Sequence, residues 1–277
     1  MTISFIADFE ALADGYTIED ESVDGYFWDT AASQPVATVR NTPLTAPSGT
    51  KYVEWVTDAS EASIDANPLF TDVNLTIGVP IYLAGFFRFE RIGGNDVWAD
   101  TGADPYQFDK LWEFRDGATF RWGIGVGWNG WYSTGTDHKF TFDAWYSTAL
   151  IGNQGPDHIV ADVAPYDADN PYLCDYETWY GVVLKVTPNT TSSGRVEIWI
   201  NGTQIINKTQ VTCLANPVVN SCYYGGTIGQ PAYNTPSHKR QADALLVTDD
   251  WQDIIDYGYL GGGGPLAGPT NVHWTPL

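Results

Sequence analysis

The sequence predicts an all-β protein, an antiparallel sandwich of two β-sheets, and three observations support this prediction. Segments in which apolar and polar residues alternate recur along the chain, and Gly, Asp, Asn or Pro separate them. The 277 residues include 28 Gly, 16 Pro and one Met, a composition that suits strands and turns better than helices. With 43% hydrophobic and 17% charged residues the chain can bury one large core, and sandwiches of this size commonly form one domain.

Strands are expected along most of the chain, beginning with SFIADFEAL. The next expected strands are KYVEWVTD, IYLAGFFRFERI, KLWEFRD, FRWGIGVGW and KFTFDAWY, and only WQDIIDYG near the C-terminus is expected to be helical. Residues 1–260 are predicted to form one domain. The glycine run from Gly261 to Gly264 is a flexible break, so residues 261–277 are predicted to be a hinge and a C-terminal arm.

The clearest strand signal is a hairpin in the last third of the chain. In GRVEIWI the apolar residues alternate, which predicts that Glu197 and Trp199 lie on one face and that the core contains Val196, Ile198 and Ile200. Asn201 and Gly202 follow, and both tolerate the positive φ of a type I′ turn. The segment TQIIN is therefore expected to be the second strand of the hairpin.

The order of the last segments resembles the last third of laminin-G-like and concanavalin A-like jelly-roll domains. The residues that carry the resemblance are the hairpin EIWING, the strand GGTIG and the closing strand DALLVTDD; SFIADFEAL likewise resembles the opening strand of sugar-binding jelly rolls. The resemblance implies a jelly-roll β-sandwich and a carbohydrate ligand. Because the same fold houses polysaccharide lyases and glycosidases, it implies a substrate class more firmly than an activity.

The net charge limits the partners. Thirteen Lys and Arg against 34 Asp and Glu give a formal charge of −21, which repels nucleic acid and anionic membranes, so neither is an expected partner. A strongly anionic substrate would require the basic residues to gather in one cleft. Alternatively, the acidity only keeps the protein soluble.

Aromatic residues are the first candidates for a binding site. The chain has 12 Trp and 16 Tyr, and sugar rings stack on such side chains. In RWGIGVGWNGWY the aromatic residues lie among Gly and Asn, so the residues expected to contact a glycan are Trp122, Trp128, Trp131 and Tyr132. Most of the other Trp residues are expected to be core, where Trp is usually buried.

Acidic loops are the second candidates. The segment GGNDVWADTGADPYQFD has no strand periodicity, and the predicted ligands of a structural Ca²⁺ ion are Asp96, Asp100 and Asp104. Asp also favours turns through its own local hydrogen bonds, which is the alternative explanation.

Catalytic residues have the weakest sequence signal. A lyase needs a base and cations that neutralise a uronate carboxylate, and the candidates are Arg88, Arg91 and His158, with Arg115 and Arg121 as further cations. RFERI loosely resembles the Arg-Glu-Arg strand of alginate-lyase relatives, but the chain lacks the Gln that they place before their His and the Lys of a later strand. No paired-carboxylate pattern of a retaining glycosidase is present. The arginines would otherwise pair with acids across strands.

Targeting signals and cysteines say little about location. The segment MTISFIADFEAL contains no visible signal peptide, and no apolar run approaches the roughly 18 residues that span a bilayer. Cys213 and Cys222 bracket a short loop and are expected to form a disulfide in an oxidising environment, whereas Cys174 is expected to be a buried or idle thiol. An extracellular or virion-surface location is the expectation.

Two classes of function follow. The first is a non-catalytic carbohydrate-binding or surface-display protein, such as an adhesin or a decoration protein of a virion or filament. The alternative is a secreted polysaccharide lyase or glycoside hydrolase of the same fold. Residues 265–277 are expected either to fold back on their own sandwich or to dock on a neighbouring subunit.

Overall fold

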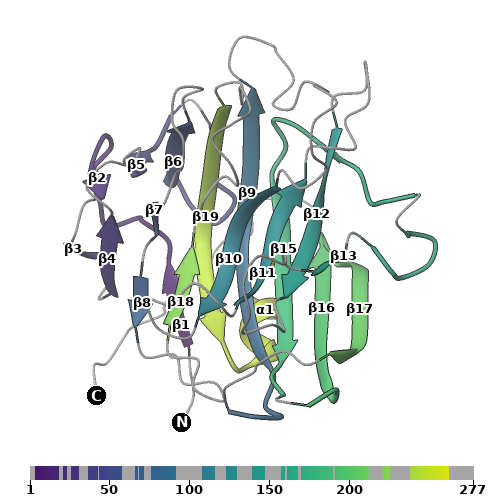
Figure 1. Cartoon of the computed structure of the whole chain (residues 1–277). Coiled ribbons are helices and arrows are strands. Elements are labelled where there is room, and N and C mark those ends of the chain that lie inside the picture. Colours follow the sequence, from purple (N-terminus) through teal and green to yellow (C-terminus); the bar gives the residue numbers. More distant parts are fainter. Residues whose placement is uncertain are drawn as a thin grey trace.

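Two large antiparallel sheets pack against each other, and a small third sheet lies beside them (Figure 1). The computed structural model describes residues 4–18, 21–23, 26–30, 37–42, 44–57, 66–67, 69–71, 76–91, 108–115, 123–129, 139–146, 157–159, 161–167, 170–189, 191–211, 221–224 and 238–261. Every strand pairing within these residues is antiparallel, which confirms the predicted fold class.

The nine-stranded sheet has the order β17 (Thr203–Val211), β16 (Gly194–Ile200), β15 (Tyr180–Thr187), β9 (Ile81–Arg91), β19 (His238–Thr248), β6 (Tyr52–Thr57), β5 (Ala37–Arg40) and β2 (Thr17–Ile18), with β1 (Ser4–Ala7) also paired to β19. The seven-stranded sheet has the order β13 (Asp157–Ile159), β12 (Lys139–Tyr146), β11 (Gly123–Asn129), β10 (Phe108–Arg115), β18 (Ser221–Tyr224) and β8 (Leu69–Thr71), with β14 (Cys174–Asp175) also paired to β12. The small sheet contains β3 (Glu21–Val23), β4 (Tyr26–Thr30) and β7 (Ala66–Asn67).

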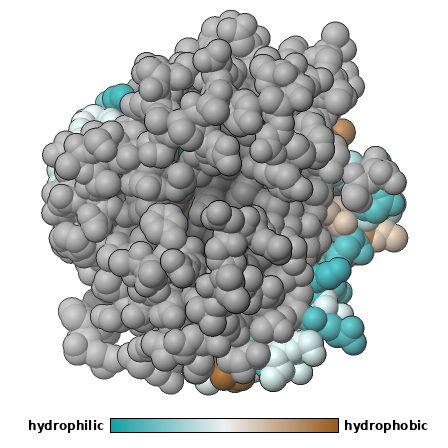
Figure 2. Space-filling view, viewed as in Figure 1, coloured by the Kyte–Doolittle hydropathy of each residue, from teal (hydrophilic) through white to brown (hydrophobic). Residues whose placement is uncertain are grey.

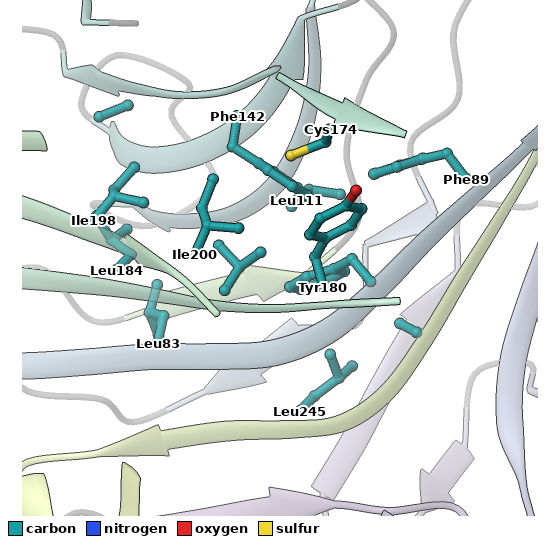
Figure 3. Packing of buried hydrophobic residues seen from close by; sticks show 14 of the residues in the cluster. Leu83, Phe89, Leu111, Phe142, Cys174, Tyr180, Leu184, Ile198, Ile200 and Leu245 are labelled. Carbon is teal, nitrogen blue, oxygen red and sulfur yellow. The ribbon is translucent and has the colours of Figure 1, made fainter. Parts of the chain in front are cut away.

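The main core lies between the two large sheets. Phe89 of β9 meets Phe140 of β12 edge to face, with ring centroids 5.1 Å apart, and Tyr180 of β15 reaches Phe142. Figure 3 shows Tyr180, Leu184 and Leu83 from one sheet facing Phe142 and Leu111 from the other. Cys174 is fully buried in the same cluster, as predicted. Cys222 lies in β18, but Cys213 is outside the described residues, so the disulfide stays a prediction.

The predicted hairpin is confirmed. Asn201 and Gly202 have φ of 46° and 81°, as a type I′ turn requires, and β16 pairs with β17 on either side of them. The core-facing residues are fully buried: Val196, Ile198 and Ile200. Glu197 and Trp199 lie on the opposite face, since Glu197 pairs across to Lys185 rather than into the core.

The predicted helix is α1 (Trp251–Asp256), and it covers the outer face of the nine-stranded sheet (Figure 1). Asp250 caps it by accepting a hydrogen bond from the Gln252 amide, the usual way to satisfy a first-turn N–H. Ile254 and Tyr259 then pack on Phe86 and Leu246 in a second apolar cluster. No helix among the residues that the structure describes has the length and apolar character to cross a membrane.

The edge strand β17 is polar where it is exposed. Lys208, Thr209 and Gln210 are exposed, and Figure 2 shows hydrophilic atoms, with some hydrophobic ones among them, on this side of the molecule. Nearby, the Asp162 amide donates to the Ile205 carbonyl and covers part of the edge. Charged side chains and a covering loop both discourage an edge strand from pairing with another chain.

Gly181 and Gly202 leave room for the chain segment that follows α1. A Cβ on Gly181 would overlap the carbonyl oxygen of Tyr259, and one on Gly202 would overlap that of Leu260. Gly78 provides a matched comparison, because its φ of +78° is close to the +81° of Gly202 but nothing lies within 4 Å of its Cβ position.

Gly202→Ala is therefore expected to lower the free energy of unfolding more than Gly78→Ala. Both variants bear the left-handed backbone cost of about 1 to 2 kcal/mol, and Gly202→Ala adds an overpacking cost of about 1 to 3 kcal/mol. Guanidinium unfolding of the two variants measures the difference. Equal losses would show that the segment after α1 does not pack tightly on the turn.

Candidate functional site

The outward face of the seven-stranded sheet is defined by the residues that face the core. Phe140, Phe142 and Ala144 of β12 belong to the main core cluster. Because side chains alternate along a strand, Asp143 and Trp145 hold positions on the opposite, outward face. Thr141 is on that face as well and is fully buried, so the face is covered at that end of β12.

One row of residues crosses this outward face over five neighbouring strands. His158 of β13 is opposite Trp145 of β12, which is opposite Gly125 of β11. Gly125 is opposite Glu113 of β10, which is opposite Tyr223 of β18. Neighbouring strands lie about 4.8 Å apart, so the row spans about 19 Å from end to end.

The middle strand of the row has glycine at three of its four outward positions. These residues are Gly123, Gly125 and Gly127, with Asn129 at the fourth position, whereas the core-side positions of β11 are apolar. Glycine weakens a strand, and within a sheet it often marks a place where a ligand approaches the backbone closely. Because Gly123, Gly125 and Gly127 carry no side chain, the outward face of β11 is a strip of backbone there, which we call the glycine floor. It lies between β10 and β12, two strands about 10 Å apart.

Both sides of this glycine floor hold polar residue types. Lys110 and Arg115 of β10 are opposite Gly127 and Gly123, and Asp143 of β12 is opposite Gly127 from the other side. The register thus assigns residues of these types to one face: cationic Lys and Arg, acidic Asp and Glu, and His, Tyr and Trp, which carry an imidazole, a phenol and an indole. These are the groups with which proteins bind sugar hydroxyls and uronate carboxylates and transfer protons.

Arg88 lies elsewhere, on the outer face of the nine-stranded sheet. Its Nη1 donates to Glu90 Oε2 at 2.8 Å and to Gln241 Oε1 at 2.5 Å. Gln241 Nε2 in turn donates to Glu54 Oε2 at 2.9 Å. Burial would raise the pKa of Glu90, but the hydrogen bonds from Arg88 and Gln241 and the charges of Lys239 and Arg88 outweigh it, so this pKa is lowered. Arg88 therefore pairs with Glu90 of its own strand and with Gln241 of the neighbouring strand β19.

The predicted lyase residues are divided between the two sheets. Arg88 and Arg91 belong to β9 of the nine-stranded sheet, whereas His158 belongs to β13 of the seven-stranded sheet. The structure brings His158 and Arg115 onto one face, but it does not bring Arg88 to them. Arg121 lies outside the described residues.

The predicted glycan contacts are only partly described. Trp128 is opposite Phe142, a core residue, so Trp128 occupies a core-side register position of β11. Trp122, Trp131 and Tyr132 lie outside the described residues, and the role of all four in binding stays a prediction.

The predicted calcium ligands also lie outside the described residues: Asp96, Asp100 and Asp104. Within the described part of the chain, no three His, Cys, Asp or Glu side chains group closely enough to hold a metal ion. A structural Ca²⁺ ion stays a prediction.

Sequence reasoning missed Glu113, Tyr223 and the glycine floor. The signal for the floor was available, because GIGVGW alternates glycine with apolar residues. The pairing of Glu113 with Tyr223 joins segments that are far apart in the sequence, and local patterns do not encode it.

Comparisons with known proteins identify the fold. Neither a protein-family model nor a curated protein sequence matches the chain. Among solved structures, the alginate lyase Aly36B aligns with 13% identity and a TM-score of 0.55, over 88% of this chain and 96% of the enzyme. An endo-β-1,4-glucuronan lyase from the fungus Trichoderma reesei aligns with 13% identity and a TM-score of 0.51, over 90% of this chain and 97% of the enzyme. The chain thus shares the jelly-roll β-sandwich fold of these polysaccharide lyases.

Proposed function

We propose that this protein is a polysaccharide lyase that binds a uronate-containing polysaccharide on the outward face of the seven-stranded sheet. The row from His158 to Tyr223 across the glycines of β11 carries the proposal. The fold supports it, because an alginate lyase and a glucuronan lyase share that fold and both act on polymers of uronic acids. A variant of Aly36B has also been solved with an alginate trisaccharide.

The register and the residue types of the face support binding. Glycines at the outward positions of β11 would let a sugar chain approach its backbone, and the neighbouring outward position on β12 holds Trp145, a residue type on which pyranose rings stack. Lys110 and Arg115 bring positive charge to this face of a protein with a formal charge of −21. Each of these cations can pair with one uronate carboxylate of a bound chain, and the acidic residues Glu113 and Asp143 share the face with them.

The reaction is a β-elimination at the uronate unit. A base removes the proton on the carbon next to the carboxylate, a carbon–carbon double bond forms, and the bond to the departing sugar oxygen breaks. That oxygen then takes a proton. Arg115 neutralises the carboxylate, which stabilises the negative charge that develops there.

Two residues of the row are able to transfer the protons. His158 is at one end and Tyr223 is at the other, and about 19 Å of sheet separates them, so only one of them serves a given glycosidic bond. Tyr223 is the neighbour of Glu113 and lies on the same side of the floor as Arg115, which favours Tyr223 at the reacting unit and His158 at a flanking unit.

Tyr223→Phe is expected to lower the rate of unsaturated-product formation by about 100-fold or more, because it removes only the proton-transferring hydroxyl. Arg115→Ala is expected to lower both the rate and the affinity for alginate, and His158→Asn mainly the affinity. Lys208→Ala, at an exposed position of the other sheet, is the control and should behave as the wild type. If Tyr223→Phe and His158→Asn both retain full activity, the row is not the site of the reaction.

A further inference from the structure

A second aromatic and polar cluster lies on the opposite side of the sandwich, on the outer face of the nine-stranded sheet. Trp199 of β16 and Trp251 of α1 have ring centroids 5.3 Å apart and planes inclined by 55°. Trp251 also contacts Tyr82, at a centroid distance of 5.2 Å. Both indoles are half-buried: each packs against the second apolar cluster and keeps part of its surface exposed to solvent.

Polar side chains adjoin the indoles in a fixed arrangement. Glu197 is only 3% exposed, and its carboxylate lies 2.9 Å from Lys185 Nζ and 3.2 Å from Arg195 Nη2. It also accepts a hydrogen bond from Gln204 Nε2 at 3.2 Å. Gln204 is opposite Trp199 in the sheet register, so the polar groups begin directly beside the indole.

The arrangement holds these side chains in place before any ligand arrives. Arg195 donates from Nε and Nη2 to Asn207 Oδ1, at 2.9 and 2.6 Å, which fixes its guanidinium plane. The side chains of Lys185 and Arg195 nevertheless stay 21% and 40% exposed. Because little side-chain freedom remains to be lost, a ligand that binds here incurs a small ordering cost.

A structural role alone accounts for only part of this cluster. Pinning α1 to the sheet requires the contacts between Trp251, Tyr82 and Trp199, but it does not require a nearly buried carboxylate that orients a Lys, an Arg and a Gln at the rim of an indole. Aromatic rings flanked by oriented hydrogen-bonding groups are what a pyranose needs: its apolar face stacks on the ring while its hydroxyls meet the polar groups.

We propose that Trp199, Trp251, Lys185, Arg195 and Gln204 form a second, non-catalytic binding site for a pyranose chain. It lies on the side of the protein away from the seven-stranded sheet, and it stands independently of the lyase activity proposed for that sheet. A lyase with a second site would stay attached to its polymer while the first site releases product, which raises the effective concentration of substrate.

The test is calorimetric titration with two probes, an alginate tetrasaccharide for uronates and a cello-oligosaccharide for neutral pyranoses. It is performed on the wild type and on a Trp145→Ala variant, which alters the outward face of the seven-stranded sheet. We expect at least one probe to bind the Trp145→Ala protein. In that background, Trp199→Ala and Lys185→Gln should each weaken binding by about fivefold or more.

Trp179→Ala is the matched control, because Trp179 is another half-buried indole packed on the same apolar cluster, but its ring contact is with Tyr52 of β6, three strands from the β15 of Lys185 in the sheet order. It should lose stability without losing affinity. Since Lys185→Gln retains a hydrogen-bond donor beside Glu197 and removes no apolar core contact, it keeps the test valid if Trp199→Ala fails to fold. Unchanged affinity in Lys185→Gln, or no binding of either probe to the Trp145→Ala protein, would overturn the second site. Loss of all binding in Trp145→Ala would overturn the second site but would support the binding site proposed on the seven-stranded sheet.

Discussion

Ile198→Ala is expected to lower the free energy of unfolding by about 2 to 5 kcal/mol, the range for truncating a fully buried Ile to Ala. Ile198 has 0% exposure in the core between the sheets (Figure 3), and it is paired with Leu184 on one side and Ile206 on the other. The strands on both sides hold the backbone, so the surroundings collapse little and a cavity remains. Urea or guanidinium unfolding measures the loss.

Ile255→Ala is the matched control, because it removes the same atoms from a residue of α1 that is 48% exposed. We expect a change within about 1 kcal/mol, since alanine also favours the helix. Equal losses in the two variants would contradict the placement of Ile198 in the main core.

Asp243→Asn is expected to change how stability depends on pH. Asp243 is fully buried, and Ser48 donates to it from its amide at 2.7 Å and from its hydroxyl at 2.8 Å. Burial raises the pKa of Asp243 from 3.8 to about 7 despite these hydrogen bonds, and the nearby charge of Glu10 adds to the rise. Between about pH 4 and pH 7, the carboxyl group of Asp243 is therefore protonated in the native state and ionised in the unfolded chain.

The sign follows from this difference in proton binding. The stability that Asp243 contributes is fully present below about pH 4 and is lost as the pH rises to about 7. A shift of about three pKa units corresponds to about 4 kcal/mol as an upper bound. The asparagine variant keeps an acceptor for Ser48 but cannot ionise. Its free energy of unfolding should therefore rise relative to that of the wild type, by up to this amount, between pH 4 and pH 8.

Unfolding of both proteins at several pH values measures the gain. Glu90 has a lowered pKa, so its contribution runs in the opposite direction and is lost as the pH falls. Because Glu90 is present in both proteins, its effect cancels in the difference between them. Parallel stability curves for the wild type and Asp243→Asn would contradict a proton held by Asp243.

The sequence predicted local elements well where alternation and turn chemistry agree. Asn201 and Gly202 fix both the turn and the register of its strands, so Ile198 could be assigned to the core without a structure. The burial of Glu197 could not be predicted in this way. Alternation places Glu197 on the outer face, but it does not show that the side chains of Lys185, on the neighbouring strand, and Arg195 form ion pairs with it there.

The candidate site was harder to predict because strand order is a long-range property. Alternation assigns Glu113 and His158 to a face of their own strands, but it does not say that β10 lies next to β18 or that β13 lies next to β12. Trp128 illustrates a different difficulty. Its Gly and Asn neighbours suggested exposure, whereas the alternation with Ile124 and Val126 in β11 gives it a core-side position.

Incubation of the wild-type protein with alginate and with glucuronan tests the proposed function most directly. Shorter chains with unsaturated uronate ends, detected by their ultraviolet absorbance, are the predicted result, and Tyr223→Phe should form them about 100-fold more slowly. Polymers that remain full length and gain no unsaturated ends, even when the protein binds them tightly, would contradict the lyase and support a glycan-binding protein.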